Sequence, residues 1–345
     1  MRAGDFVPSV QLLRRPAGAR PLLAPAPMAS AGIGRHPTYL RVVATPSCNH
    51  RCSYCHMEGD PRRKGFEGGL PLEDLRAALE ALVPAGLAKI KFVGGEPLLR
   101  PDLPELVSAA RSIFPAADLS VITAGGVPAS AQDLAFAAGL DRMNVSIHGF
   151  GERAFVARGN RPKLLHARTS FLEALLRRGR PTKLNYVYSG PQDDDDLREL
   201  LAFAAGRGVL VNVLDDLNAD IGPEELIARL KGWLGRPDER ARDIDPHSLD
   251  TTRLRWRGGP WVEIKTEHLG DHAPWRDCST CARRRLCREG IFALRLTHDG
   301  RIRPCMDRSD LDYPLVAEIQ RRGVAAASEG LQDWLALRIG SRGGR

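Results

Sequence analysis

Short β-rich apolar runs alternate along this chain with amphipathic stretches of helical spacing. The helical stretches fall at residues 72–82, 103–113, 131–138, 170–176 and 197–205. The β-rich runs flank them at residues 39–45, 90–93, 119–123, 142–147, 183–188 and 209–214. This alternation predicts parallel strands joined by right-handed crossovers, and therefore an α/β fold that is either an open doubly wound sheet or a full or partial barrel.

The pattern is less regular in the last third of the chain. It predicts a helix over residues 223–234, a polar linker over 236–248, and a hairpin that turns at Gly258 and Gly259. Residues 1–36 are rich in Pro, Ala and Arg and show no sustained periodicity. We expect them to form a flexible extension that packs little.

Composition places the chain among globular proteins, with 345 residues of which 43% are hydrophobic. No uninterrupted apolar stretch approaches the ~20 residues of a membrane helix, so no membrane partner is expected. Arg14 and Arg15 ahead of weakly apolar residues 21–28 resemble an export or transit signal, but three prolines interrupt that region. A non-native extension before a start at Met28 is an equal alternative, and we expect a cytoplasmic protein.

Charge is concentrated at the two ends of the chain. Of the net charge of +8, residues 1–36 carry +4 and residues 334–345 carry +3, which leaves the body close to neutral. A groove that binds a polyanion by bulk charge is therefore not expected, and neither is a nucleic acid partner. The four Asp residues at 193–196 precede a helical stretch, so we expect a solvated helix start rather than a cation site, because acids complement the positive end of a helix dipole.

Three cysteines follow the first predicted strand with the spacing C-x3-C-x2-C, at Cys48, Cys52 and Cys55. A structural zinc site needs four ligands, and His50 or His56 is available to complete one. An iron–sulfur cube is normally held by four cysteines, so a cube held by three would offer its fourth iron to another ligand. The cysteines alone leave both readings open.

A Gly-Gly-Glu-Pro turn at residues 94–97 follows the second predicted strand. Together with the cysteine triplet it resembles the radical S-adenosylmethionine (SAM) superfamily. The resemblance implies that a 4Fe-4S cluster on the triplet binds SAM, whose reductive cleavage gives a 5′-deoxyadenosyl radical. It also implies a set of cofactor-binding residues, which are Tyr54, Gly94, Gly95, Glu96, Thr123 and Ser146.

A second cysteine group lies near the C-terminus, at Cys278, Cys281, Cys287 and Cys305. Cys305 follows an Asp-Gly turn at 299–300 that predicts a strand pair over 293–297 and 301–303. Without further context, these four cysteines suit a zinc ribbon. In the radical SAM superfamily, such a group resembles an auxiliary 4Fe-4S site.

Residues 39–305 further resemble the GTP 3′,8-cyclase family of molybdenum cofactor biosynthesis. The resemblance implies substrate contacts at Arg41, Lys91 and Lys183. The chain departs from the family pattern because the segment between Cys281 and Cys305 is ten residues longer, contains the additional Cys287, and precedes a terminus with an Arg after the Gly pair. If Cys287 is a fourth ligand, no iron of the auxiliary cluster is open to a purine.

We therefore expect a radical SAM enzyme with a partial (βα)6 TIM-type barrel, two 4Fe-4S clusters, and a one-electron donor such as flavodoxin or ferredoxin. Its expected substrate is a small molecule, anionic or of the nucleotide or sugar kind, in a specialised biosynthetic pathway. The alternatives are a GTP 3′,8-cyclase, a peptide maturase, which the lack of a leader-binding domain ahead of the barrel disfavours, and a non-enzymatic zinc module. The expected domains are a flexible extension (1–36), the radical SAM barrel (37–220), a linker with a hairpin (221–270), and an auxiliary-cluster domain with the C-terminal tail (271–345).

Overall fold

The computed structural model describes residues 38–56, 68–216, 221–243, 251–265, 276–282 and 293–338. Its strands are β1 (Tyr39–Thr45), β2 (Lys89–Gly94), β3 (Asp118–Thr123), β4 (Arg142–Ile147), β5 (Thr182–Tyr188), β6 (Leu210–Asp215), β7 (Glu239–Asp243), β8 (Thr251–Arg255), β9 (Trp261–Lys265), β10 (Ala293–Leu296) and β11 (Ile302–Arg303). Its α-helices are α1 (Leu72–Ala81), α2 (Leu103–Ile113), α3 (Ser130–Ala137), α4 (Glu152–Ala157), α5 (Pro162–Arg177), α6 (Asp194–Ala205), α7 (Pro223–Leu234), α8 (Arg276–Ser279) and α9 (Leu315–Arg338).

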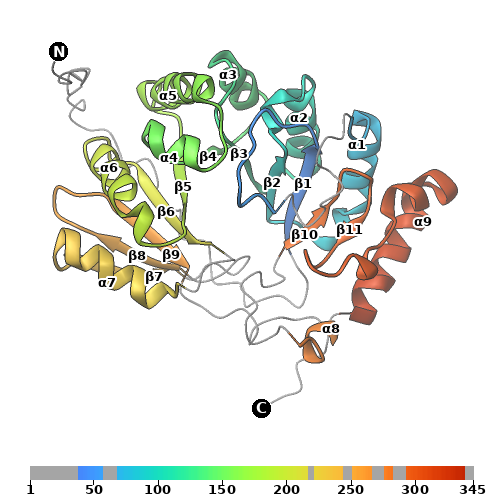
Figure 1. Cartoon of the computed structure of the whole chain (residues 1–345). Helices are drawn as coiled ribbons and strands as arrows, with labels where there is room; N and C mark the ends of the chain where they lie inside the picture. Colours follow the sequence, from blue (N-terminus) through green and yellow to red (C-terminus); the bar gives the residue numbers. More distant parts are fainter. Residues whose placement is uncertain are drawn as a thin grey trace.

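All described strands belong to one sheet, in the order β11-β10-β1-β2-β3-β4-β5-β6-β9-β8-β7. Every neighbouring pair from β10 to β9 is parallel, and antiparallel strands close the two ends. The six predicted strands are all present, and the predicted α/β fold is confirmed. Helices form an outer layer around the curved sheet, as a partial barrel requires (Figure 1).

The two faces of the sheet differ in polarity because side chains alternate along each strand. The face under the helices is apolar, and residues such as Leu40, Ile90 and Leu119 join the buried core with Leu75 and Leu79 of α1. The opposite, concave face carries polar residues from several strands, which are Arg41, Lys91, Ser120, Asn144, Lys183, Asn185, Asn212, Glu263 and Arg295. This inner face lies below the carboxyl ends of the strands, where barrel enzymes place their chemistry.

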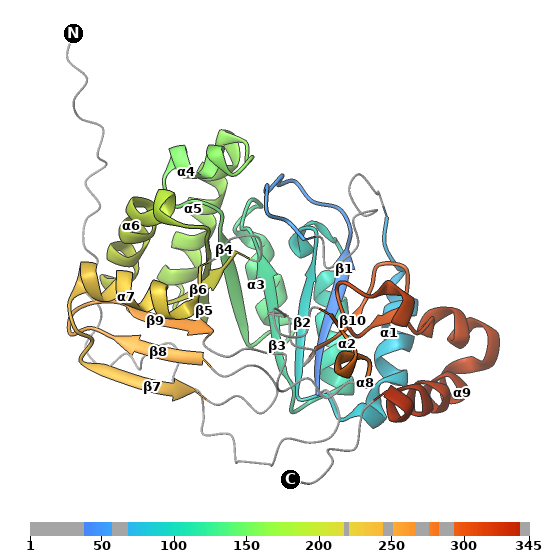
Figure 2. The same ribbon diagram turned by 60° about the horizontal axis from the view of Figure 1, so that its bottom comes forward.

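The predicted hairpin after residue 250 is confirmed as β8 and β9. It extends the sheet rather than standing apart, because β9 pairs in parallel with β6 (Figure 2). The prediction of a polar linker over residues 236–248 is wrong for residues 239–243, which form edge strand β7 against β8. The charged side chains of an edge strand hide its extended backbone from a hydrophobicity pattern.

The helical stretch predicted at 170–176 is the second half of the longer helix α5. In its first half only Arg168 is fully buried, so no set of buried apolar positions marks it as a helix. The Arg168 guanidinium donates hydrogen bonds to the backbone oxygens of Gly149 and Phe150. Helix α4, which carries one fully buried residue, Phe155, was also missed.

The C-terminal segment returns to the first strand of the barrel. β10 pairs with β1, and the predicted strand pair around residues 299–300 is confirmed as β10 and β11. Helix α9 bends at Gly323, where φ is 81°, and packs along α1, with the Ser328 hydroxyl donating to the Ala81 oxygen at 2.8 Å. Among the described helices, none combines the length and apolar character needed to cross a membrane.

Candidate active site

The cysteine loop begins directly after β1, at the carboxyl edge of the sheet. Cys48 and Cys55 are exposed and Cys52 is half-buried. The buried Asn160, which follows helix α4, contacts the middle of this loop. Its side-chain oxygen lies 3.0 Å from Nδ1 of His50 and 3.7 Å from Sγ of Cys52, and it also accepts from the backbone N–H of Arg51 at 3.4 Å.

The three thiols of this loop influence one another electrostatically. The pKa of Cys52 is raised to about 12, chiefly by burial and to a smaller extent by the neighbouring thiols of Cys55 and Cys48. Bringing three thiolates together is unfavourable unless cations compensate them, and bound iron supplies that compensation. The donor set therefore fits a metal cluster.

Within the described residues, no three His, Cys, Asp or Glu side chains converge as ligands of a single metal ion. Zinc draws its ligands to within about 2.0–2.3 Å of one point, whereas an iron–sulfur cube distributes its cysteines over different iron atoms.

The Gly-Gly-Glu-Pro turn packs against the backbone that leads into the cysteine loop. Gly95 donates its N–H to the Thr45 oxygen at 2.8 Å, and Glu96 donates to the Ser47 oxygen at 2.8 Å. A Cβ on Gly94, where φ is 144°, would lie 2.3 Å from the Thr45 oxygen, and one on Gly95 would lie 2.0 Å from the Ser47 oxygen. Glycine is therefore required at both positions by contact with β1 and its loop.

The Glu96 side chain ties this turn to the next strand. Its carboxylate accepts from the Thr123 hydroxyl and the Ala124 N–H, each at 2.7 Å, and from the Leu98 N–H at 3.1 Å. Burial raises the pKa of Glu96, and these hydrogen bonds partly offset the effect. In the structure Glu96 and Thr123 brace the turn, and their predicted contact with the cofactor stays a prediction.

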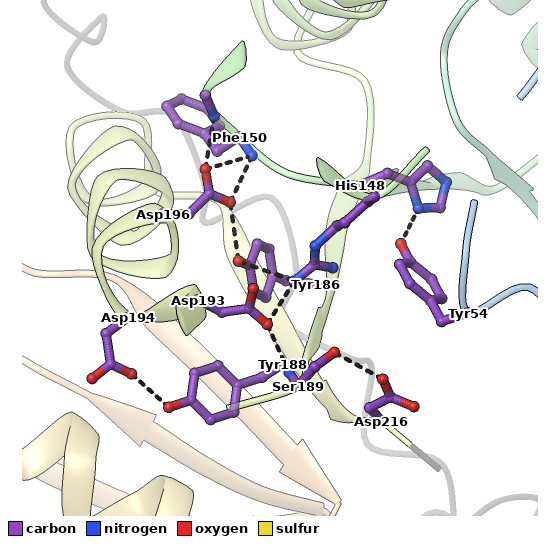
Figure 3. Close-up of polar contacts among 12 residues, drawn as sticks. Tyr54, His148, Phe150, Tyr186, Tyr188, Ser189, Asp193, Asp194, Asp196 and Asp216 are labelled. Carbon is purple, nitrogen blue, oxygen red and sulfur yellow. Dashed lines mark hydrogen bonds and ion pairs between the residues drawn. The ribbon is translucent and has the colours of Figure 1, made fainter. Parts of the chain in front are cut away.

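Tyr54, between the second and third cysteines, points toward the end of β4. Its hydroxyl forms a short hydrogen bond with Nδ1 of His148, and the Arg158 guanidinium lies 5.4 Å from its ring centre (Figure 3). Burial, together with the nearby charges of His50, Arg168 and Arg158, lowers the pKa of His148 to about 3. His148 is therefore neutral, and this wall of the site carries no titration near pH 7. Ser146, two residues earlier on the inner face of β4, is half-buried, and its predicted cofactor contact stays a prediction.

A buried polar network supports Arg158, and the sequence did not reveal it. Arg158 pairs with Asp193 at 2.7 Å and donates to the Tyr186 hydroxyl at 3.3 Å. Tyr186 donates in turn to Asp196 at 3.0 Å, and Asp196 also accepts from the Phe150 N–H (Figure 3). The expectation of a solvated acidic run is therefore wrong for Asp193 and Asp196, because their carboxylates are partners of a buried cation, a phenol and backbone N–H groups.

Two of the predicted substrate contacts are neighbours on the concave face. Arg41 of β1 and Lys91 of β2 stand opposite each other in the sheet, and Arg295 of β10 stands opposite Arg41 on the other side. The Lys91 ammonium lies 5.4 Å from the ring centre of Tyr39, whose hydroxyl accepts from Arg41 at 3.3 Å. The structure thus brings these basic groups together beneath the cysteine loop.

The pKa values of Lys91 and Tyr39 are both lowered in this crowded basic region. Burial, with Arg142, Lys89 and Arg41 adding to it against an opposing effect of Tyr39, lowers the pKa of Lys91 to about 8. Burial alone would raise the pKa of Tyr39, but Lys91, Arg41 and Lys89 overcome it and lower that pKa to about 7. Both shifts reflect the close approach of several positively charged side chains.

Lys183, the third predicted substrate contact, lies on the same face four strands from β1. Its ammonium forms a short ion pair with Glu263 of β9, and Glu263 also accepts from Arg253 of β8 at 3.1 Å. The sequence could not indicate this pairing, since nothing in it places β9 beside β6.

The second cysteine group is described in part. Cys287 lies outside the described residues, whereas Cys278, Cys281 and Cys305 are all half-buried. Cys281 affects the pKa of Arg308, which is raised chiefly by its hydrogen bond to Asp310 and to a smaller extent by Asp277 and the Cys281 thiol. The Cys281 turn therefore lies near the segment that follows Cys305.

Comparisons with known proteins agree with this geometry. Residues 42–204 match the model of the Radical SAM superfamily. A GTP 3′,8-cyclase of Mycobacterium ulcerans (strain Agy99) is 32% identical over 313 residues, which cover 86% of this chain and 83% of the cyclase. A GTP 3′,8-cyclase of Ectopseudomonas mendocina (strain ymp) is 30% identical over 273 residues, which cover 77% of this chain and 81% of the cyclase.

Solved structures with the same fold include Streptococcus suis SuiB. SuiB bound to S-adenosylmethionine superposes with a TM-score of 0.54 at 15% identity, and SuiB bound to precursor peptide SuiA with a TM-score of 0.56 at 13% identity. The match covers 80% and 79% of this chain and 60% of each SuiB chain. At this identity the likeness shows a common fold.

Proposed function

Because the chain belongs to the radical SAM superfamily and is a radical SAM enzyme, we propose that it abstracts hydrogen from a small anionic molecule of the nucleotide or sugar kind, in a specialised biosynthetic pathway. The observation that carries this proposal is the placement of Arg41 and Lys91 side by side on the concave face, beneath the cysteine loop.

Cys48, Cys52 and Cys55 are the residues that would hold the catalytic cluster. When bound, the cluster supplies one electron from an external donor to SAM, which breaks a sulfonium C–S bond and gives methionine and a 5′-deoxyadenosyl radical. The Gly94–Gly95 backbone fixes the position of the loop against β1, and Asn160 fixes its middle. These contacts with the protein itself, rather than additional metal ligands, would keep the thiols in place.

The substrate would bind on the concave face with its anionic group toward Arg41 and Lys91. Both side chains are half-buried bases, so a phosphate or carboxylate there would gain charge-assisted hydrogen bonds. The Tyr54–His148 pair would form one wall of the site, where His148 stays neutral because its pKa is lowered to about 3. Enclosure by the barrel would keep water away from a reactive radical.

A second cluster is part of the same proposal. Cys278, Cys281 and Cys305 would hold it, with Cys287 as fourth ligand. The nearness of the Cys281 turn to the segment after Cys305 supports a shared site. With four cysteine ligands the cluster would conduct electrons or brace the C-terminal segment rather than bind substrate.

The second candidate function is that of a GTP 3′,8-cyclase, which the names of the similar curated proteins favour. Arg41, Lys91 and Lys183 stand where the resemblance to that family implies substrate contacts. The ion pair between Lys183 and Glu263 distinguishes this chain's concave face from a uniformly basic one.

The proposal is tested by anaerobic reconstitution followed by reduction in the presence of SAM. We expect about eight irons per chain and little zinc, because each cube holds four irons, and we expect 5′-deoxyadenosine to form. Addition of GTP, GMP or a nucleotide sugar in separate reactions identifies the class of compound that accelerates 5′-deoxyadenosine release. Formation of the cyclised nucleotide from GTP would select the second candidate, and zinc without iron would refute enzymatic function.

The matched control replaces Cys48 by Ala, which removes a cluster ligand from an exposed position with little effect on packing. This variant should retain the iron of the second cluster and form no 5′-deoxyadenosine. Wild-type protein that carries the full iron content yet leaves SAM intact under reduction would contradict the proposal.

A further inference from the structure

The turn between helices α4 and α5 lies directly against the cysteine loop. The Ser53 N–H donates to the Arg158 oxygen at 3.0 Å, and the Arg51 N–H donates to the side chain of Asn160 at 3.4 Å. The approach is so close that a Cβ on Gly159 would lie 2.5 Å from the Arg51 oxygen. Helix α4 and the loop after β1 therefore share one end of the barrel (Figure 2).

Three exposed basic residues belong to these two segments. Arg51 lies in the cysteine loop, Arg161 directly precedes α5, and Lys163 lies in the first turn of α5. Within the part of the chain that the structure describes, none of the three forms an ion pair. An apolar residue adjoins them, since Val156 in the last turn of α4 is 43% exposed and accepts the Gly159 N–H at 2.9 Å.

Exposed acidic residues flank the other end of α4. Glu152 is the first residue of this helix, and Oε2 of Glu199 would lie 3.4 Å from a Cβ on Gly151. A helix of six residues is about 9 Å long, so α4 separates these carboxylates from the turn that contacts the cysteine loop. The exposed Arg153 follows Glu152 in the sequence and offsets its charge. The surface next to the cysteine loop is therefore locally basic, although the body of the chain is close to neutral.

We propose that Arg51, Arg161 and Lys163 form a docking surface for an acidic one-electron carrier protein of the flavodoxin type. The carrier delivers the electron that the catalytic cluster passes to SAM. In each transfer the carrier is oxidised by one electron and the cluster is reduced by one electron. This inference rests on the proposed function, in which the cysteine loop holds that cluster, and it names the partner of the same site.

Charge and position together select this partner. The electron has to enter close to the cluster, and the three bases lie on the cysteine loop or within three residues of Asn160, which contacts that loop. Exposed cations without an ion pair attract an acidic surface, and none of them has to give up a partner on docking. Complementary charges chiefly raise the rate of association. Weak redox complexes use small interfaces, for which Val156 supplies an apolar contact among charged side chains.

The test follows SAM cleavage by the reconstituted holoenzyme with either reduced flavodoxin or reduced methyl viologen as electron donor. In Arg161→Glu/Lys163→Glu, kcat/KM for flavodoxin should fall about tenfold or more at an ionic strength of about 0.1 M, because reversal of two charges removes the electrostatic attraction. The rate with methyl viologen, a small cation, should not fall. Both substitutions leave the cysteine loop unchanged, and acidic residues suit the start of a helix.

Arg177→Glu/Lys231→Glu is the matched control, because it makes the same change in charge at two exposed bases elsewhere. Arg177 lies about 21 Å from Lys163 along α5, and Lys231 lies on α7. This control should keep the wild-type kcat/KM for flavodoxin. An equal loss in both double variants overturns the inference, and so does an equal loss with both donors or no loss at all. If Arg161→Glu/Lys163→Glu does not fold, the wild type decides: its kcat/KM for flavodoxin should fall steeply with added salt, and a value independent of salt overturns the inference.

The outcome is separable from that of the proposed function. Binding of oxidised flavodoxin, measured by calorimetry on the same proteins, requires no SAM cleavage. A protein that cleaves SAM with methyl viologen but binds flavodoxin equally well in the wild type and in Arg161→Glu/Lys163→Glu keeps the proposed function and loses this inference. A protein that leaves SAM intact, yet binds flavodoxin about tenfold more weakly in that variant alone, loses the proposed function and keeps the docking surface.

Discussion

The side-chain oxygen of Asn160 lies 3.0 Å from Nδ1 of His50, a residue 110 positions earlier in the chain. Asn160 follows helix α4, and His50 lies between the first two cysteines. Next to it, Gly159 has a φ of 85°, and a Cβ there would lie 2.5 Å from the Arg51 oxygen. The turn between α4 and α5 therefore holds the cysteine loop by direct contact, and this relationship gives the first prediction.

Asn160→Ala should weaken retention of the catalytic cluster. The change removes the oxygen that contacts Nδ1 of His50 and accepts from the Arg51 N–H, and a buried polar group left unpaired costs about 1–3 kcal/mol. We expect faster loss of iron to a chelator and a lower free energy of unfolding in urea. Gln132→Ala is the control, because Gln132 is a buried carboxamide that bonds to Phe171 in the core. It should lower stability while iron loss keeps the wild-type rate; equal iron loss in both variants would count against the positioning role.

Gly95→Ala should prevent loading of the catalytic cluster. Its Cβ would lie 2.0 Å from the Ser47 oxygen, so the turn and the cysteine loop would have to separate. We expect about four fewer irons per chain, the content of one cube. Gly206→Ala provides the comparison, since nothing lies within 4 Å of its added Cβ and its backbone is helical. That variant should load normally and gain about 0.4–1 kcal/mol of stability. Normal loading of Gly95→Ala would contradict the contact.

Anion binding should weaken as the pH rises from 6 to 9. Lys91 is cationic only below its pKa of about 8, and Tyr39 becomes anionic above its pKa of about 7, so both changes remove positive charge with increasing pH. Sulfate is a suitable probe because its charge is constant over this range. Calorimetry should show the affinity falling in two steps, and Tyr39→Phe should remove the lower one. An affinity that is flat with pH in the wild type would refute the assignment.

Asp193→Asn should destabilise the protein by about 3–5 kcal/mol, the usual cost of leaving one member of a buried ion pair without its partner. Arg158 lies 2.7 Å from Asp193, with side chains only 8% and 10% exposed. Urea unfolding measures the loss. Glu239→Gln breaks an exposed pair of the same kind and should cost no more than about 1 kcal/mol. Similar losses of unfolding free energy in the two variants would show that burial of the Arg158–Asp193 pair contributes little to stability.

Cys281→Ala and Cys287→Ala should each cause loss of the second cluster and leave the first cluster in place. Because a cube contains four irons, we expect about four irons per chain and intact SAM cleavage in both variants. Electron paramagnetic resonance of the reduced protein, with and without SAM, separates the two clusters. If Cys287→Ala keeps the full iron content and an unchanged spectrum, Cys287 is not a ligand and one iron of the second cluster is open.

The order of strands β1 to β6, the helices between them other than α4, and the position of the chemistry were accessible from the sequence. Alternation of apolar and amphipathic runs predicted the six strands from β1 to β6, because each strand and each helix buries its own periodic face. Local motifs located the cysteine loop and the Gly-Gly-Glu-Pro turn, because their residues act through backbone and thiol groups that are close in the chain. The side-by-side placement of Arg41 and Lys91 follows from β1 and β2 being consecutive parallel strands.

Only the tertiary structure decided which charges neutralise one another. The insertion of β9 beside β6 gives Lys183 the partner Glu263, and the contact between the end of α4 and the start of α6 gives Arg158 the partner Asp193. Neither pair has a signature in the sequence, since an acidic side chain reads as solvent-exposed unless its distant partner is known. Strand order and helix packing are set by contacts between remote segments, and these contacts determine whether a basic residue on the inner face is available to a substrate.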